Sequence, residues 1–336
     1  MKKLLEKLLL EQEDIFKPPA EEELEQRKKE SAENFVERYK GKLNPDGSYD
    51  FDCDLDDLGG IIKDGKFLIK FGKVKGDFNC SEYKLTSLKG APKYVGGGFN
   101  CWHNELTSLK GAPEYVGRYF DCRGNRLTSL KGAPERVEGY FDCAFNQLTS
   151  LEGAPKYVKG DFDCCHNELT SLKGAPEYVG GHFNCHHNRL RSSLEGAPKK
   201  VGGSFHCERN TLTSLKGAPE YVGRSFICSW NDLTSLEGAP KRVNGGFNCS
   251  VNELKSLKGA PEYVGRDFIC SLNKLTSLEG APEKVGRNFW CDSNKLTTLK
   301  GAPKYVGGRF ICYGNPVEFT EEEVRKVSEV KGRIEV

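Results

Sequence analysis

The hydrophobic positions along the chain recur at a fixed interval. Phenylalanine, cysteine, asparagine and leucine follow one another in the order F-x-C-x-x-N-x-L-x-x-L, and a Gly-Ala-Pro corner and a valine come next. The cysteines lie 21 residues apart from Cys80 to Cys185 and again from Cys207 to Cys312, and one additional residue within residues 190–194 separates the two series. A fixed period of this size predicts a solenoid in which each copy of the unit forms one turn.

The segment around each phenylalanine is predicted to be a strand. Successive side chains of a strand point to opposite faces, so Phe162 and Cys164 are expected to point into the core together. A cysteine at this place in every copy is then a small buried hydrophobe, and its use at every level favours packing over disulfide bonds. The asparagine three residues later, such as Asn167, is expected to satisfy backbone groups between adjacent turns.

The two ends of the chain differ from the repeats. Residues 1–48 are charged and rich in Glu, Lys and Leu, and they predict a helical N-terminal cap or arm that a proline pair divides into two helices. Residues 49–317 hold one degenerate copy and twelve regular copies of the repeat. In residues 318–336, Thr320 and Glu323 form a capping box that predicts a short helix, and a strand follows it. Caps are expected because an open end of a stacked core exposes apolar surface and an unpaired strand edge.

The unit V-x-x-x-F-x-C-x-x-N-x-L-x-x-L-x-G-A-P resembles a leucine-rich repeat, because Phe, Cys, Asn and Leu occupy the places of L-x-L-x-x-N-x-L. Its short form is most similar to the repeats of bacterial pathogen effectors and related bacteriophage-encoded proteins, over about residues 49–317. The resemblance implies a horseshoe with a parallel concave β-sheet and short helical caps at both ends. It also implies a scaffold that binds a host or partner protein and sequesters or inhibits it. Residues 316–336 are too few for the ubiquitin-ligase domain that related effectors often carry.

The residues that vary between copies lie just before the phenylalanine, between it and the cysteine, and in the two positions after the cysteine. Strand alternation turns such side chains away from the core, onto the concave face. Every histidine and tryptophan of the chain lies at these positions. Aromatic and apolar side chains exposed on a rigid sheet are typical of an interface core. They favour a protein-binding face over the alternative that solvent-facing positions vary without functional consequence. The candidate partner-binding residues are Trp102, His103, Tyr119, Asp121, Arg123, Tyr140, Asp142, Asp163, His182, His186, His206, Ile227, Trp230, Ile269, Trp290, Ile311 and Tyr313.

The stretch from Cys164 to Leu190 has the residue types of a zinc site. Cys165, His186 and Glu208 are expected to share one outward column, with neighbours about 4.8 Å apart across strands, and such ligands can hold zinc. Cys164 and its counterparts need no metal, however, because the repeat explains them. An open face without visible supporting groups favours a polar contact surface, so no metal and no cofactor is expected.

An enzyme is the alternative from another class. A metal-dependent or cysteine hydrolase could use the His-rich half of the face, with Cys165 and His186 as a nucleophile–base pair. The sequence indicates no oxyanion donors and no glycine-rich phosphate loop outside the repeat, so a role without catalysis is favoured.

Net charge, apolar stretches and cysteine content indicate which classes of partner and which compartment to expect. The net charge of the 336 residues is only +2, so nucleic acid is not expected as a partner. No stretch is long enough to cross a membrane, and the N-terminus lacks the uninterrupted apolar core of a signal peptide. Fourteen cysteines in a chain of this kind indicate a reducing compartment, the cytoplasm, or the host cytosol for an effector. Self-association through the N-terminal helices is a further option.

Overall fold

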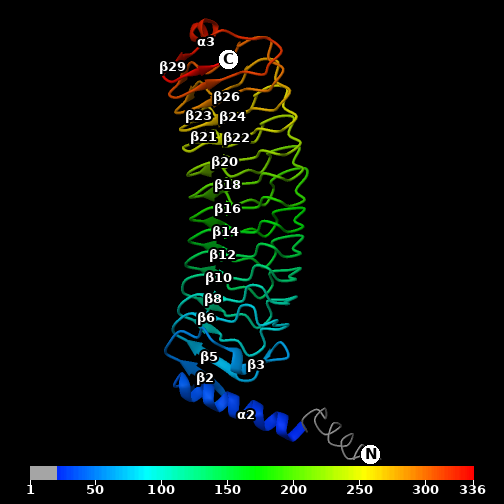
Figure 1. Cartoon of the computed structure of the whole chain (residues 1–336), viewed down its shortest axis with the longest axis vertical. Helices are drawn as coiled ribbons and strands as arrows, with labels where there is room; N and C mark the ends of the chain where they lie inside the picture. The colour runs from blue at the N-terminus through cyan, green and yellow to red at the C-terminus, as the bar shows by residue number, and fades with distance from the viewer. Residues whose placement is uncertain (1–20) are drawn as a thin grey trace, which may run out of the picture.

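The computed structural model describes residues 21–336, which form one long column of stacked turns (Figure 1). Two sheets run along the column, one with 15 strands and one with 13 strands. The helix α2 (Glu21–Arg38) lies at the N-terminal end, and the helix α3 (Glu321–Val327) lies at the C-terminal end. The predicted parallel repeat solenoid with a short helix at each end is therefore confirmed, although the turns stack in a nearly straight column (Figure 1) and not in the predicted horseshoe. The first of the two helices predicted in residues 1–48 lies outside the described residues.

The 13-stranded sheet, which we call the phenylalanine sheet, is parallel throughout and has one strand from each turn. Its strands are β6 (Phe78–Asn79), β8 (Phe99–Asn100), β10 (Phe120–Asp121), β12 (Phe141–Asp142), β14 (Phe162–Asp163), β16 (Phe183–Asn184), β18 (Phe205–His206), β20 (Phe226–Ile227), β22 (Phe247–Asn248), β24 (Phe268–Ile269), β26 (Phe289–Trp290), β28 (Phe310–Ile311) and β30 (Ile334–Glu335).

The 15-stranded sheet, which we call the valine sheet, is a second element of each turn that the sequence analysis missed. A strand of only two residues, followed by a short glycine-rich turn, has too little alternation to be recognised. Its strands are β1 (Lys42–Leu43), β2 (Ser48–Phe51), β5 (Lys70–Val74), β7 (Tyr94–Val95), β9 (Tyr115–Val116), β11 (Arg136–Val137), β13 (Tyr157–Val158), β15 (Tyr178–Val179), β17 (Lys200–Val201), β19 (Tyr221–Val222), β21 (Arg242–Val243), β23 (Tyr263–Val264), β25 (Lys284–Val285), β27 (Tyr305–Val306) and β29 (Glu329–Val330).

The core consists of columns of like side chains. Phe183 is fully buried, and its ring stacks on Phe162 and on Phe205 with 5.3 Å between ring centroids on each side. The repeat cysteines form a parallel buried column, and all fourteen cysteines of the chain are free thiols. The thiol of Cys164, for example, lies 3.2 Å from the carbonyl oxygen of Asn184 in the next turn. The cysteines therefore pack as small hydrophobes, as predicted.

The repeat asparagines join adjacent turns by hydrogen bonds. The side-chain amide of Asn167 donates to the carbonyl oxygens of Cys143 and Cys164, at 3.0 and 3.2 Å. Its Oδ1 accepts from the backbone N–H of Leu148 at 3.0 Å. Buried backbone groups that no strand pairing satisfies thus find partners, and leaving one of them unpaired costs about 1–3 kcal/mol.

The extra residue in residues 190–194 leaves the stacking intact. Leu190 and Leu194 are both fully buried, so the additional residue is accommodated in the loop between them. On either side the pairing keeps its register, with Phe183 opposite Phe205 and Asn184 opposite His206. The two series of cysteines are therefore one continuous column.

Side chains from both helices close the ends of the core. From α2, Phe35 packs on Phe51 and Phe71 with ring centroids 5.7 and 6.3 Å apart. Between α2 and the regular turns, η1 (Gly59–Ile61), β3 (Ile62–Lys63) and β4 (Lys66–Phe67) form an irregular first turn. The capping box of Thr320 and Glu323 begins α3, as predicted, and β29 and β30 then extend the two sheets. Self-association through the N-terminal end stays a prediction. In residues 21–336 no helix is both long and apolar enough to cross a membrane.

Truncating a stacked phenylalanine should destabilise the solenoid far more than truncating an exposed tryptophan. Phe183→Ala removes a ring that is fully buried, so we expect a loss of about 3–5 kcal/mol in the free energy of unfolding. Trp230→Ala alters a side chain that is 52% exposed, and a loss below about 1 kcal/mol is expected. Denaturation followed by circular dichroism measures both. A larger loss for Trp230→Ala would show that buried and exposed positions had been exchanged.

Candidate functional site

The outward surface of the phenylalanine sheet carries most of the predicted binding residues, and we call it the strand face. It presents three columns, formed by the residues just before each phenylalanine, just after it, and just after each repeat cysteine. Because the strands pair in register, members of one column lie on adjacent strands. The residues that the structure places in these columns are Trp102, Tyr119, Asp121, Arg123, Tyr140, Asp142, Asp163, His182, His186, His206, Ile227, Ile269, Trp290, Ile311 and Tyr313.

Three carboxylates follow one another in the central column. Asp121 pairs in register with Asp142, and Asp142 with Asp163. Arg123 lies between the first two, with its guanidinium 3.4 Å from a carboxylate oxygen of Asp121 and 3.5 Å from one of Asp142. Asp121 is only 2% exposed, so its prediction as a contact residue for a partner is wrong; it supports Arg123 instead. We call these three carboxylates the acid row.

Two carboxyl groups of the acid row, those of Asp121 and Asp142, have raised pKa values. Burial raises the pKa of Asp142 to about 7, and the charges of Asp121 and Asp163 add to this effect, although the backbone N–H of Ala144 opposes it. Burial also raises the pKa of Asp121. A cationic group placed over the row by a partner would favour the ionised form of these carboxyls.

Aromatic rings lie beside the acid row. The rings of Tyr119 and Tyr140 stack with 4.9 Å between centroids, and burial raises the pKa of Tyr140 to about 12, so its hydroxyl stays protonated and able to donate. On the other side, the guanidinium of Arg123 lies 5.4 Å from the ring centre of Trp102. This part of the strand face combines flat apolar rings with negative charge.

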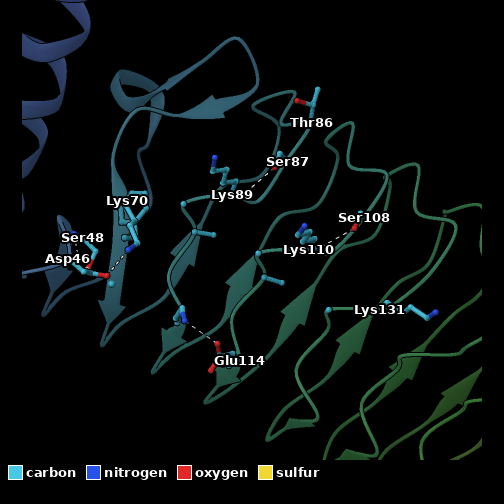
Figure 2. A pocket seen from close by; sticks show the side chains of 18 residues that line it. Asp46, Ser48, Lys70, Thr86, Ser87, Lys89, Ser108, Lys110, Glu114 and Lys131 are labelled. Atoms are coloured by element: carbon cyan, nitrogen blue, oxygen red, sulfur yellow. Dashed lines mark hydrogen bonds and ion pairs between the residues drawn. The ribbon is translucent and has the colours of Figure 1, made fainter.

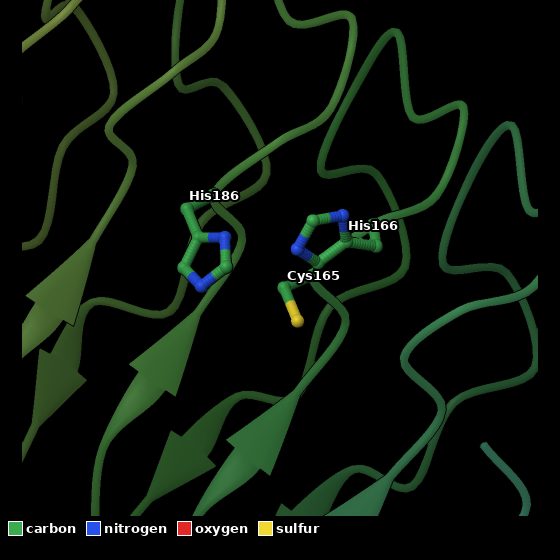
Figure 3. A group of neighbouring side chains, drawn as sticks. All are labelled: Cys165, His166 and His186. Carbon is green, nitrogen blue, oxygen red and sulfur yellow. The ribbon is translucent and has the colours of Figure 1, made fainter. Parts of the chain in front are cut away.

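A cluster of thiol and imidazole groups follows in the next turns (Figure 3). Potential ligand atoms of Cys165, His166 and His186 all lie within 4.8 Å of one another. The column predicted from sequence contained Glu208 instead of His166. His166 is in the left-handed backbone region, with φ of 51°, and this turn brings its ring back to the cysteine that precedes it. Glu208 instead lies against His206, with 3.4 Å between a carboxylate oxygen and Nδ1.

The cluster does not have the features of a catalytic cysteine. Burial raises the pKa of Cys165, and the negative charge of Asp163 raises it further, so the group is a thiol at neutral pH. A nucleophilic cysteine needs the opposite environment, in which positive charge stabilises the thiolate. This environment does not support the hydrolase hypothesis, and the absence of catalysis stays a prediction.

His103 and Trp230 are not on the strand face, which corrects their prediction as strand positions. Both come two residues after a repeat cysteine and have positive φ angles of 52° and 55° in the turn that follows the strand. Trp230 is stacked against Arg209, with 4.9 Å from the guanidinium carbon to the ring centre, and is followed in the same column by Val251 and Leu272. Trp230, Val251 and Leu272 line an open groove of about 720 Å³ beside the strand face.

In the C-terminal half of the strand face, the central column is mainly apolar, whereas the two flanking columns are mainly polar. Ile269 and Trp290 lie in register on adjacent strands and are partly exposed, as is Ile227 two strands before Ile269. Ile311, by contrast, is fully buried in β28, which pairs with the last strand β30, so its prediction as a contact residue is wrong. Tyr313 is 47% exposed beyond it.

A hollow of about 1140 Å³ lies outside these columns, at the Gly-Ala-Pro corners of the first turns (Figure 2). In later turns a corner lysine pairs with a glutamate of the preceding turn, as Lys216 does with Glu195 at 2.9 Å. In the first three regular turns, lysines occupy this position successively, at Lys89, Lys110 and Lys131, and the charge of the hollow is mainly positive. This run of corner lysines was not predicted from the sequence.

Comparison with known proteins places the fold. Neither a protein-family model nor a curated protein sequence matches the chain. Among solved structures it is similar to YopM from Yersinia enterocolitica WA-314, with 19% sequence identity and a TM-score of 0.51 over 80% of this chain and 63% of that chain. A structure of YopM from Yersinia pestis, described as a leucine-rich effector protein, has 18% identity and a TM-score of 0.37 over 77% of this chain and 88% of that chain. The first match supports a leucine-rich-repeat-like parallel solenoid, and the chain spans less than two thirds of that protein's length.

Neutralising one member of the acid row should change how stability depends on pH. Because the pKa of Asp142 is raised to about 7 in the folded state, against about 3.9 when unfolded, its ionisation destabilises the fold as pH rises from about 4 to 7. Asp142→Asn should therefore stabilise the protein at pH 8, by on the order of 1–4 kcal/mol, and much less at pH 4.5. Asparagine occupies the same column at Asn100 and Asn184, so the substitution suits the repeat.

Thermal melts at the two pH values measure this effect, with the exposed Glu177→Gln as the control that should change neither. An Asp142→Asn variant that is destabilised equally at both pH values would contradict the raised pKa.

Proposed function

We propose that this chain is a protein-binding solenoid whose strand face recognises its partner. The observation that carries the proposal is the departure of this one face from the repeat. The buried columns are nearly invariant, whereas the outward columns carry carboxylates, stacked tyrosines and histidines in one half, and Ile227, Ile269 and Trp290 in the other. Partly exposed aromatic and aliphatic side chains of this kind are the usual anchors of protein interfaces.

The scaffold supports this role because it holds the anchors in place. Each outward side chain is flanked in sequence by buried core residues whose backbone pairs with the turns on both sides, as at β14 and β16. The backbone beneath the anchors is therefore ordered before a partner arrives, and little conformational entropy is lost on binding.

The two halves of the face suit different parts of a partner. A lysine or arginine could lie against the rings of Tyr119 and Tyr140 while its charge neutralises Asp142. The apolar central column of the other half suits a hydrophobic segment that covers Ile269 and Trp290. A partner that fits both halves therefore has a protein surface with a basic end and an apolar end.

We further propose that the partner is a host protein that this chain sequesters or inhibits. The repeats resemble those of pathogen effectors, and the solenoid is similar in fold to YopM. The free cysteines support a reducing compartment, such as the cytosol, as the place of action.

Removal of a central anchor should abolish partner binding while the fold persists. The full chain would be immobilised, partners captured from host lysate would be identified by mass spectrometry, and the affinity of each recombinant partner would be measured by calorimetry. Trp290→Ala should weaken binding by about thirtyfold or more, because loss of an interface anchor typically costs 2 kcal/mol or more. The melting temperature of the variant should stay close to that of the parent.

A double charge exchange on the opposite surface, Lys216→Glu with Glu220→Lys, is the matched control, and its affinity should change by less than about threefold. Trp230→Ala serves as a second comparison that tests the groove beside the face. Loss of binding in the corner variant, together with full binding by Trp290→Ala, would locate the interface away from the strand face.

A further inference from the structure

We propose that Cys165, His166 and His186 bind one zinc ion in the middle of the strand face. The three side chains converge from two adjacent turns, with the cysteine between the two imidazole rings (Figure 3). Their potential ligand atoms lie within 4.8 Å of one another. Zinc ligands at 2.0–2.3 Å from the metal are about 3.3–3.8 Å apart in a tetrahedral site, so small side-chain rotations bring the group to zinc geometry.

The repeat does not account for these residues. The position after the repeat cysteine is serine in four other turns, at Ser81, Ser229, Ser250 and Ser271, so neither Cys165 nor His186 is needed for packing. In-register pairing of the two turns then places Cys165 and His186 side by side. A thiol and an imidazole lie at neighbouring points of one column, and a second imidazole is turned toward them. This donor set binds zinc in preference to calcium or magnesium.

Neighbouring groups orient the ligands. Nδ1 of His187 lies 2.9 Å from Nδ1 of His186, which leaves Nε2 of His186 free of hydrogen bonds within residues 21–336. A carboxylate oxygen of Asp163 accepts from the backbone N–H of Cys165 at 2.9 Å, and Asn184 donates to the other oxygen at 3.0 Å. Supporting contacts of this kind hold metal ligands in place and fix the imidazole tautomer.

Zinc binding at this cluster requires neutral imidazoles and a thiolate, so the zinc–sulfur bond forms as the thiol proton of Cys165 passes to solvent.

A fourth coordination position is open. Beside the cluster is a hollow of about 370 Å³ lined by Asp163, His186, His206 and Glu208 among others. Oε2 of Glu208 is buried there and has no hydrogen-bond partner among the described residues. Either this carboxylate or a water molecule completes the tetrahedron.

Metal titration of the purified full chain tests the proposal without any partner. Metal-free, reduced protein would be titrated with Co²⁺ as a spectroscopic probe, and Zn²⁺ affinity would be measured by competition with a chromophoric chelator. We expect one equivalent of metal and a sulfur-to-cobalt charge-transfer band. Cys165→Ser should abolish the band, and both this variant and His186→Ala should weaken Zn²⁺ binding by about a hundredfold or more.

Two control variants separate this site from adventitious binding. Cys53→Ser changes the one cysteine of the first, degenerate turn, and His103→Ala removes an exposed histidine elsewhere; both should bind metal like the parent. Cys165→Ser should melt like the parent, because serine occupies the same position in other turns. Absence of stoichiometric binding, or binding that survives both Cys165→Ser and His186→Ala, would overturn the proposal. Either result would leave the proposed protein-binding function standing, since that function is measured by partner affinity.

Discussion

In-register pairing between consecutive turns is the constraint on which the rest of the molecule depends. No turn has a core of its own, because each buries its phenylalanine, cysteine and leucines against the same residues of its neighbours. Backbone groups that the short strands leave unpaired are satisfied by the asparagine of the adjacent turn. Stability is therefore mostly a sum of contacts between neighbours, as is typical of repeat proteins.

In-register pairing also explains why side chains of one kind lie next to one another on the strand face. Stacking like on like is favourable for phenylalanine, tyrosine and asparagine, and the chain uses it at Tyr119 and Tyr140 as well as in the core. It is unfavourable for carboxylates, yet Asp121, Asp142 and Asp163 occupy successive levels, and burial raises the pKa of Asp121 and of Asp142. A row that weakens the fold on its own is most simply understood as a surface prepared for a positively charged contact.

The sequence predicted the repeated part of this structure well, because a strict period reports directly on neighbouring contacts. The buried columns, the free cysteines and the helix that begins at Thr320 all follow from local spacing. Errors arose where one turn departs from simple alternation. The left-handed residue after the strand moved Trp230 off the face and brought His166 to Cys165, and only the backbone conformation reveals either effect. Ile311 was misassigned because strand alternation gives the direction of a side chain but not its burial.

Uniform stacking also fixes the distances between side chains on the strand face. Asp142 on β12 and Trp290 on β26 are seven strands apart, and neighbouring strands are separated by about 4.8 Å, so the charged and apolar anchors are about 34 Å from each other. A folded domain of 100 residues has a radius of gyration of about 13 Å and would barely reach both. A single partner that engages the whole face must therefore be elongated or large, and a compact small protein would have to choose one half, leaving the other for a second molecule.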